Sequence, residues 1–333
     1  MKRWSFFRPT FMALVCALWF SSVNAGVHFA ALPDRTSATL SLTDAGALVE
    51  EVRLIGLEQG INEVRLSWQG LPVLEDSIRL FILDGENITD VLGVSHPAGE
   101  TAMVWQIYSS ESALVAARIN YVLSRIDGLF PIRIISNEEE TSCRLERYLV
   151  LRNFSGEDFE RISVISPGGS VSNRPVRHGE TLRMLLSVHE GVGVEKFLRY
   201  GSRNTPGAAV GKEKGISVYY RIANSVSSGL GQTPIPGGKA RVFHRDSRGE
   251  TLLLGEDSIE TVHPGEYAEI YLGETRDIAV HKTLMKEQPV NIRRNRDDRI
   301  VLHDTEEIVR FVIENFKDAA VVLNIRHHIP GQW

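Results

Sequence analysis

The sequence predicts an all-β protein, built from tandem β-sandwich modules of the immunoglobulin-like kind. Short apolar runs with alternating polar residues recur along the chain, and Gly, Pro, Asn and Asp punctuate them. One run, from Ala113 to Leu123, alternates at strict period two. The composition, 43% hydrophobic and 24% charged over 333 residues, is that of a globular chain and excludes a disordered or collagen-like protein.

The first residues have the pattern of a secretory signal peptide. Lys2, Arg3 and Arg8 precede or flank an unbroken apolar run at 11–20, and small residues follow it up to Ala25. The run is too short to cross a bilayer, which needs about 20 apolar residues. We therefore expect a signal peptide over 1–25, cleavage after Ala25, and export to the periplasm or cell surface of a Gram-negative-type bacterium.

Cleavage would change the charge and the cysteine content of the chain. It removes three Lys/Arg and no acid, so the formal charge goes from −5 to 34 − 42 = −8, which argues against a nucleic-acid partner. It also removes Cys16 and leaves Cys143 alone, so no internal disulfide is expected. No later apolar run approaches spanning length, so we expect no transmembrane segment in the mature chain.

We divide that chain into an N-terminal β module (26–110), a middle β module (111–201) and a C-terminal β-sandwich module (216–333).

Turn signals separate the strands expected in the N-terminal module. Apolar runs that end near Leu54 and begin at Val64 flank Glu58-Gln59-Gly60, which predicts a β-hairpin. A further run over 78–83 ends at Asp84-Gly85, another turn signal.

The rest of the chain contains strand-like runs as well. The alternation over Ala113–Leu123 predicts one long strand, and a run over 145–151 meets a turn at 153–156. Further strands are expected at 182–188, 216–222, 240–244 and 267–272.

Residues 308–316 fit two structures. Their apolar side chains lie at helical spacing, and the sequence 304–307 would cap a helix there. The same residues alternate as a strand with Val309, Phe311 and Ile313 on one face. Periodicity alone leaves both open.

Complete catalytic motifs are absent from the sequence. It contains no G-x-S-x-G, no H-E-x-x-H and no paired C-x-x-C motif. The segment 207–212 resembles a phosphate-binding loop, but it is one residue short and lacks a Ser or Thr after Lys212. We interpret it as part of a loop or linker over 202–215, and we expect no cofactor and no catalytic residue that can be named.

Five side chains form the densest set of metal-ligating types and are the candidate metal ligands. They are His244, Asp246, Glu256, Asp257 and His263. The alternative, which we favour, is that 246–249 is a hairpin turn in which the Asp246 carboxylate binds its own backbone.

Other charged and thiol groups give weaker chemical signals. Glu256 and Asp257 could serve as the paired carboxylates of a sugar hydrolase only if they face each other. The run Glu138-Glu139-Glu140 is interpreted as a solvated loop. The arginines of 293–299 are interrupted by acids and accompanied by no aromatic residue, which indicates a surface loop and not a nucleic-acid patch. Cys143 is interpreted as an inert, half-buried thiol.

Several segments together resemble a bacterial family. The stretch 234–243 (PIPGGKARVF) is similar to its "PLPAG-x-VRVY" strand, 254–257 to its "GED" turn, and 263–266 to its "HTP-x-GE" stretch. Leu272 to Ile278 fits "LG-x-x-DV", and Asn153 to Asp158 fits "N-x-(T/S)-GE". Residues 49–60 resemble its N-terminal hairpin. On these segments the chain resembles the domain-of-unknown-function 4139 family, the mucoidy-inhibitor-A-like proteins.

The resemblance implies tandem β-sandwiches and a strand over 308–316 that leads to Asn315 and a turn at Lys317-Asp318. Members of the family run on beyond the position of Trp333. The resemblance thus implies an incomplete C-terminal module with an open sheet edge and an exposed Trp333. It transfers no catalytic residue.

Three functions remain as hypotheses. The first is a non-catalytic binding or structural protein of the cell envelope, with a protein or a glycan as its partner. The second is a periplasmic hydrolase that acts on extracellular or capsular polysaccharide, as the family name suggests. The third is a metal-binding module that uses His244, Asp246 and His263.

Overall fold

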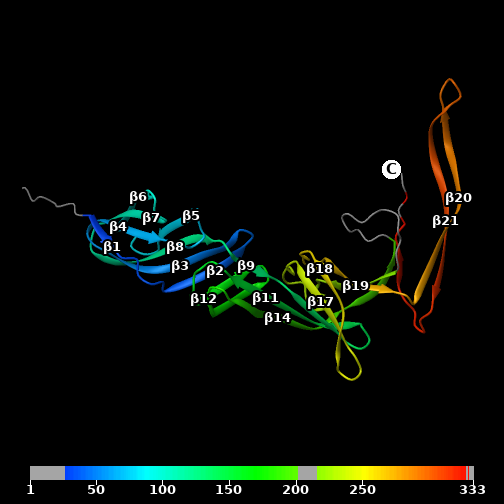
Figure 1. Ribbon diagram of the computed structural model, residues 1–333, viewed down its shortest axis with the longest axis horizontal. Helices are drawn as coiled ribbons and strands as arrows, with labels where there is room; N and C mark the ends of the chain where they lie inside the picture. The colour runs from blue at the N-terminus through cyan, green and yellow to red at the C-terminus, as the bar shows by residue number, and fades with distance from the viewer. Residues whose placement is uncertain (1–26, 202–215, 328, 330–333) are drawn as a thin grey trace, which may run out of the picture. The chain divides into compact units, whose positions relative to one another are not determined.

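A computed structural model describes residues 27–201, 216–327 and 329 (Figure 1). These residues form β-strands joined by turns, and the only helical element described is a short 3-10 turn, η1 (Val226–Ser228). The predicted all-β class is therefore confirmed, with strands arranged in several mixed sheets. The signal-like segment 1–25, the expected linker 202–215 and Trp333 lie outside the described residues.

The chain divides into two compact units, and the smaller contains Arg53–Gln69, Phe81–Arg118 and the segment that ends at Asp34. It holds a four-stranded sheet with the order β1-β4-β7-β6. These strands are β1 (Val27–Ala30), β4 (Gly60–Ser67), β7 (Ala102–Ser109) and β6 (Thr89–Ser95). Val64 and Trp105 are buried in its core.

The hairpin predicted around Glu58-Gln59-Gly60 is wrong, although both of its strands exist. The strand before the turn is β3 (Gly46–Leu57), which pairs with β2 (Ser37–Thr43), whereas β4 pairs with β1 and β7. The chain therefore passes from one sheet to another at this turn. Two alternating runs around a turn signal look the same whether they pair with each other or not.

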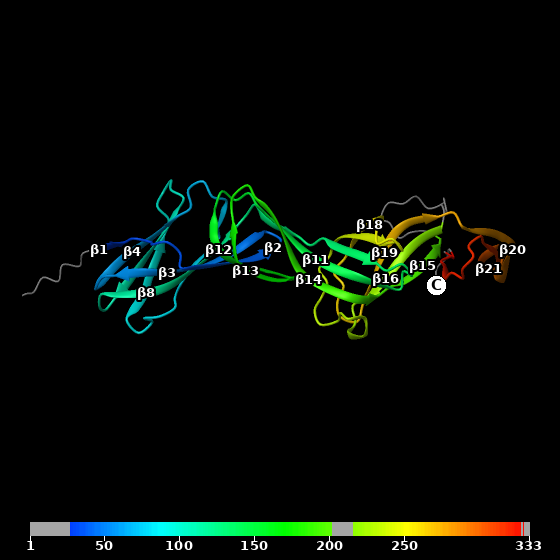
Figure 2. The same ribbon diagram turned by 90° about the horizontal axis from the view of Figure 1, so that it is seen from below.

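The larger unit includes a six-stranded sheet with the order β13-β12-β2-β3-β8-β5, in which β3, β5 and β8 contribute residues to both units. Its further strands are β13 (Gly169–Val176), β12 (Phe159–Ser166), β8 (Ala113–Leu123) and β5 (Val73–Ile82). Strand β8 buries every second residue from Val115 to Leu123, as its alternation predicted. Strands β2, β12 and β13 can be followed side by side in Figure 2.

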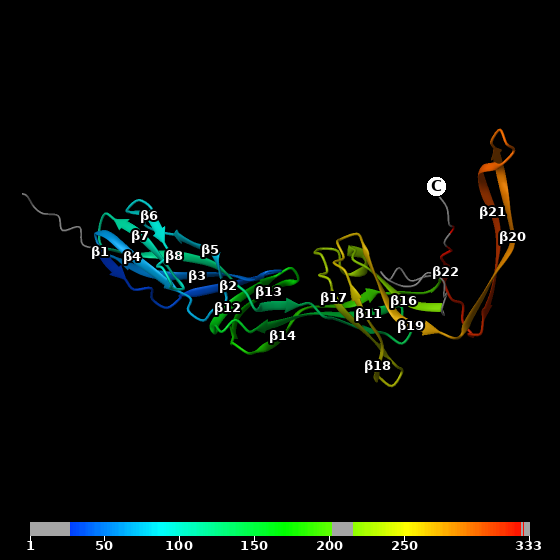
Figure 3. The ribbon, with the colours of Figure 1, turned by 45° about the horizontal axis from the view of Figure 1, so that its top comes forward.

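Two further sheets of the larger unit form a sandwich. One has the order β14-β11-β10-β17-β18 with β9 on β11, and the other the order β19-β16-β15-β22. The first is built from β9 (Ile126–Leu129), β10 (Ile132–Ser136), β11 (Ser142–Asn153), β14 (Thr181–Gly193), β17 (Gly238–Arg245) and β18 (Thr251–Ile259). The second is built from β15 (Glu195–Tyr200), β16 (Ile216–Ala223), β19 (Tyr267–Thr275) and β22 (Leu323–Ile325). Figure 3 labels β16, β19 and β22.

One apolar core joins these two sheets. Ile134 and Val242 come from the first sheet, and Tyr220 and Ile270 come from the second. The sheets approach closely at Gly255, where an added Cβ would lie 2.8 Å from the Cα of Leu272. Glycine at this position of the Leu254–Asp257 stretch therefore lets β18 and β19 pack together.

The two longest strands of the unit stand in a sheet of their own. They are β20 (Ile278–Arg294) and β21 (Ile300–Asn315), and they pair only with each other among the described residues (Figure 1). The strand alternative for 308–316 is thus confirmed. Strand β21 ends at Asn315, whose side chain accepts from the N–H of Lys317 and donates to the carbonyl of Ala319.

Candidate functional site

The candidate metal ligands lie along β17, β18 and the turns beside them, and each has another partner. Nδ1 of His244 lies 3.2 Å from Oγ of Ser136. The Asp246 carboxylate accepts hydrogen bonds from the backbone N–H of Arg248 (3.0 Å) and of Glu250 (2.8 Å). Asp246 therefore holds the turn that the sequence indicated at 246–249.

The two neighbouring acids of β18 also have separate roles. Glu256 accepts from Nζ of Lys239 and Nε of Arg241, both at 2.6 Å. Asp257 accepts from the backbone N–H of Tyr271 at 2.9 Å, which links β18 to β19. Consecutive strand residues point to opposite faces of a sheet, so these carboxylates do not converge on one bond.

The last candidate ligand, His263, donates its backbone N–H to the carboxylate of Glu266 at 2.8 Å. Across the ranges that the structure describes, no group of three or more His, Cys, Asp or Glu side chains is placed to hold a metal ion. The five candidates are therefore not brought together.

A polar cluster that the sequence did not indicate links β10 to β16. Oη of Tyr220 donates to the Glu140 carboxylate at 2.5 Å and lies 3.4 Å from Oγ of Ser136, and Lys196 forms an ion pair with Glu140. Burial alone would raise the pKa of Glu140, but the hydrogen bonds from Lys196 and Tyr220 outweigh it and hold this pKa below its ordinary value.

The solvated-loop interpretation of Glu138-Glu139-Glu140 therefore needs correction at its third residue. Glu138 and Glu139 are exposed, whereas Glu140 is partly buried against Tyr220. Nothing in three identical residues tells which one turns inward, because the difference is set by a tyrosine eighty residues away in the sequence.

The cluster is built for packing and not for nucleophilic catalysis. A serine and a histidine at hydrogen-bond distance, such as Ser136 and His244, are the geometry of a nucleophile and its base. Ser136, however, is only 1% exposed, so a substrate cannot reach its hydroxyl. Cys143 is fully buried, more than the sequence suggested, and burial raises the pKa of its thiol to about 12, which leaves it unreactive near neutral pH.

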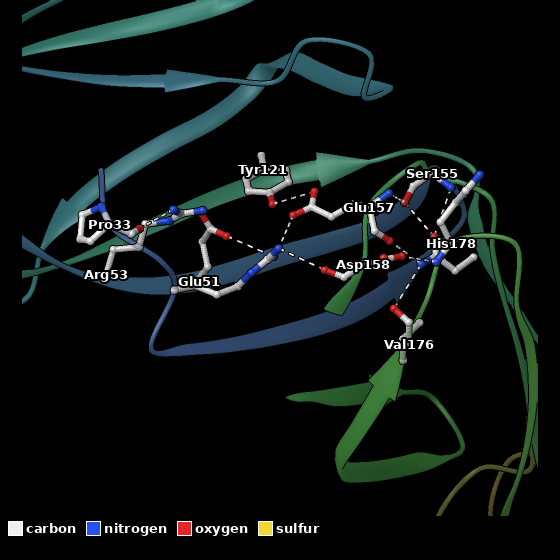
Figure 4. A network of polar contacts seen from close by, with 11 residues as sticks. Pro33, Glu51, Arg53, Tyr121, Ser155, Glu157, Asp158, Val176 and His178 are labelled. Atoms are coloured by element: carbon white, nitrogen blue, oxygen red, sulfur yellow. Dashed lines mark hydrogen bonds and ion pairs between the residues drawn. The ribbon is translucent and has the colours of Figure 1, made fainter. Parts of the chain in front are cut away.

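A second polar network joins Glu51, Glu157 and Asp158, which Figure 4 labels, through the side chain of Arg35. The Arg35 guanidinium lies 2.5 Å from the Glu157 carboxylate, 3.4 Å from that of Glu51, and over the ring of Phe159. Burial is the largest single effect on Arg35 and would lower its pKa, but the charges and hydrogen bond of its partners, Glu157 foremost, together outweigh it and raise this pKa. The Glu51 side chain is fully buried, so the network fixes structure and offers no open site.

An open depression in the larger unit is lined by several carboxylates, among them Glu138, Glu139, Glu190 and Asp246. Three of these four have partners: Glu139 accepts from Asn137, Glu190 pairs with Arg144, and Asp246 holds its turn. Glu138 is the one of these four carboxylates with no hydrogen bond or ion pair to a residue that the structure describes, so catalysis on a sugar by carboxylates would have to involve this depression.

Many exposed large apolar side chains of the larger unit lie on the β20–β21 arm, by which we mean residues 278–315. Directly opposite residues of an antiparallel pair share a face, so Val280 with Ile313 and Leu284 with Val309 belong to one apolar stripe, together with Phe311. Val280 and Phe311 pack partly against the core cluster around Tyr200.

Other apolar side chains of the arm, from its base outward, stand in solvent. Leu284, Ile308 and Ile313 are 50%, 48% and 49% exposed. Five more large apolar side chains of the arm are similarly exposed: Met285, Ile292, Ile300, Val301 and Leu302. Large exposed apolar patches on soluble proteins mark interaction surfaces, so the arm is the candidate functional site.

Comparison of the chain with models of known protein families and with curated proteins finds no match to either. In the described part of the chain, none of the helical structure has the length and apolar character that a membrane crossing needs.

Proposed function

We propose that this is an exported protein of a Gram-negative-type cell envelope that acts without catalysis, by binding a protein through the β20–β21 arm. The basic, apolar and small-residue order of 1–25 supports export. The resemblance to the mucoidy-inhibitor-A-like proteins supports a role in the envelope, and the immunoglobulin-like character of the modules belongs to the same proposal.

One observation supports this proposal most directly, namely that the arm forms a sheet of its own. Its two strands form a two-stranded sheet with no third strand among the described residues. An isolated two-stranded ribbon is only marginally stable in water, and its outer edges present unpaired backbone groups. Strand addition by a partner would pair one edge and place the partner's side chains beside the exposed apolar ones on each face.

The test is capture of envelope proteins by the purified tagged protein and by two matched variants. Ile308→Lys/Ile313→Lys changes two half-exposed residues of the arm, and Leu252→Lys/Leu253→Lys makes the same change at the 57% and 59% exposed residues of β18. We expect a stoichiometric partner that the arm variant loses and the β18 variant keeps. Equal capture by both variants would contradict the proposal.

The same experiment also tests the hypothesis that the protein is a polysaccharide hydrolase. Recovery of shortened envelope glycan, with products absent from a Glu138→Gln variant, would move the function to the carboxylate-lined depression. Glycan bound but not shortened would instead keep a non-catalytic role and replace the protein partner with a glycan.

A further inference from the structure

The two edges of the β20–β21 arm differ in how they are protected against strand pairing. Strand β20 contains Pro289, Lys282 and Lys286, which are residues that block or discourage pairing at an edge. Its pairing with β21 is also interrupted at Met285 and again between Val290 and Arg293, where β20 has one more residue than its partner. Such bulges bend the strand that carries them.

Strand β21 has none of these features along most of its length. It contains no proline, lysine or glycine, and from Leu302 to Asn315 it has no extra residue. Its outer edge is therefore a regular template for another strand, and β21 is the edge at which a partner strand would add.

The charges of β21 select its partner. Asp304, Glu306 and Glu307 lie in the first half of the regular stretch, and Arg310 lies in the second half, which also contains Glu314 near its end. No hydrogen bond or ion pair is found for Arg310 within the described ranges, and Glu307 lies directly opposite another acid, Glu287. A partner strand should therefore place an acidic side chain opposite Arg310 and a basic side chain opposite one of the acids. A second β21 that runs antiparallel to the first meets both requirements.

We propose that β21 pairs antiparallel with β21 of a second copy of this chain, which joins two arms into a four-stranded sheet with two-fold symmetry. This rests on the proposed function, since it names the occupant of the arm. In such pairing one residue faces its own copy at the symmetry axis. An axis at Glu307 or Arg310 would oppose like charges, and an axis at Val309 would set Arg310 against Ile308.

An axis at Ile308 is the favourable register of these four. It places Ile308 against its own copy and Glu306 of each chain directly opposite Arg310 of the other, so two opposite-charge pairs form per dimer. The half-exposed Ile308 gains its own copy as a side-by-side neighbour at the centre of the new sheet.

Charge reversal tests this register by sedimentation velocity of the full purified chain at rising concentration. We expect the unchanged protein to dimerise, and Glu306→Arg or Arg310→Glu alone to weaken the dimer by at least about tenfold, or about 1.4 kcal/mol. Mixing the two variants should restore association, because each mixed dimer regains both opposite-charge pairs. Restoration also shows that both variants are folded.

A cysteine pair gives an independent readout of the axis. Ile308→Cys should form a disulfide-linked dimer on mild oxidation, because residues facing each other across the axis have Cβ atoms close enough to be bridged. Ile313→Cys, equally exposed but five residues from the axis, should not.

A monomer at every concentration, or a dimer that neither reversal weakens, would overturn self-pairing. If the envelope partner is still lost from the Ile308→Lys/Ile313→Lys variant in that case, the arm binds a different protein and the proposed function stands.

Discussion

The sandwich around Tyr220 and the β20–β21 arm are made from strands of similar composition, yet only one of them is a core. In the sandwich, Ile134 and Val242 are at most 1% exposed because a second sheet covers them. In the arm, Leu284 and Ile308 are about half exposed, although β20 and β21 are longer than any strand of the sandwich. Alternation of apolar and polar residues is therefore enough to form a strand, but its apolar side chains are buried only where a second sheet packs over them.

The largest expected effect separates the two regions by one matched substitution. Ile134→Ala should lower the free energy of unfolding by about 2–5 kcal/mol, because it leaves a cavity in the sandwich. Ile308→Ala should change it by less than about 0.5 kcal/mol, since half of that side chain is already in solvent. Urea unfolding followed by far-UV circular dichroism, at low protein concentration, measures both. Equal losses would show that the arm is covered within the single chain.

Thiol reactivity should also distinguish the buried sandwich from the exposed arm, by a difference of similar size. With a pKa of about 12 against an ordinary 9.0, Cys143 should be about a thousandfold less ionised than a free thiol at pH 8. We expect Cys143 to react with a disulfide reagent only after unfolding. A cysteine placed on the arm by Thr283→Cys should react at once in the native protein. Rapid labelling of Cys143 in the unchanged protein would contradict its burial.

Much of the fold could be predicted from the sequence, because strand periodicity is a local property. Strand β8 and the turn at 246–249 depend on neighbouring residues, and both were found. Pairing is not local, which is why the turn at Glu58-Gln59-Gly60 was taken for a hairpin. Within the arm the sequence indicates only 308–316, whose spacing fits a helix or a strand and which the resemblance implies is a strand. Its exposure depends on which sheets cover it, and alternation does not specify that.

The candidate sites were less predictable for the same reason. The sequence offers His244 as one of five candidate metal ligands, but its partner in the structure is Ser136, more than a hundred residues away. Arg35, Glu51 and Glu157 meet only after the sheet has formed. A sequence signal existed for one of the three, since Glu157 belongs to the segment 153–158.

Removal of an ion pair should cost more stability at the partly buried Arg35 than on the exposed arm, but this difference is smaller than the ones above. Arg35→Ala removes a charged partner from the Glu157 and Glu51 carboxylates and should cost about 1.5–3 kcal/mol of stability. Lys286→Ala on the arm removes a 3.9 Å contact with Glu306 between exposed side chains and should cost less than about 1 kcal/mol. Thermal unfolding of the two variants checks the order, which the reverse ranking would contradict.

The smallest expected effect is on the acid side of the stability profile. The pKa of Glu140 is lower in the folded chain than in the unfolded chain, so its ionised form stabilises the fold above the unfolded pKa, and this contribution is lost as the pH falls through the folded value. Glu140→Gln should therefore lose less stability than the unchanged protein on going from neutral to acid pH. Glu138→Gln, at an exposed position, serves as the control. Parallel acid profiles for Glu140→Gln and the unchanged protein would contradict the role given to Glu140.

Amide hydrogen exchange at low and high protein concentration tests most directly whether the arm is a docking edge for its own copy. We expect peptides from 300–315 to exchange fast in the dilute protein and to become protected in the concentrated one, while peptides from β10 and β16 are protected in both. Exchange of 300–315 that is the same at both concentrations would contradict pairing between copies.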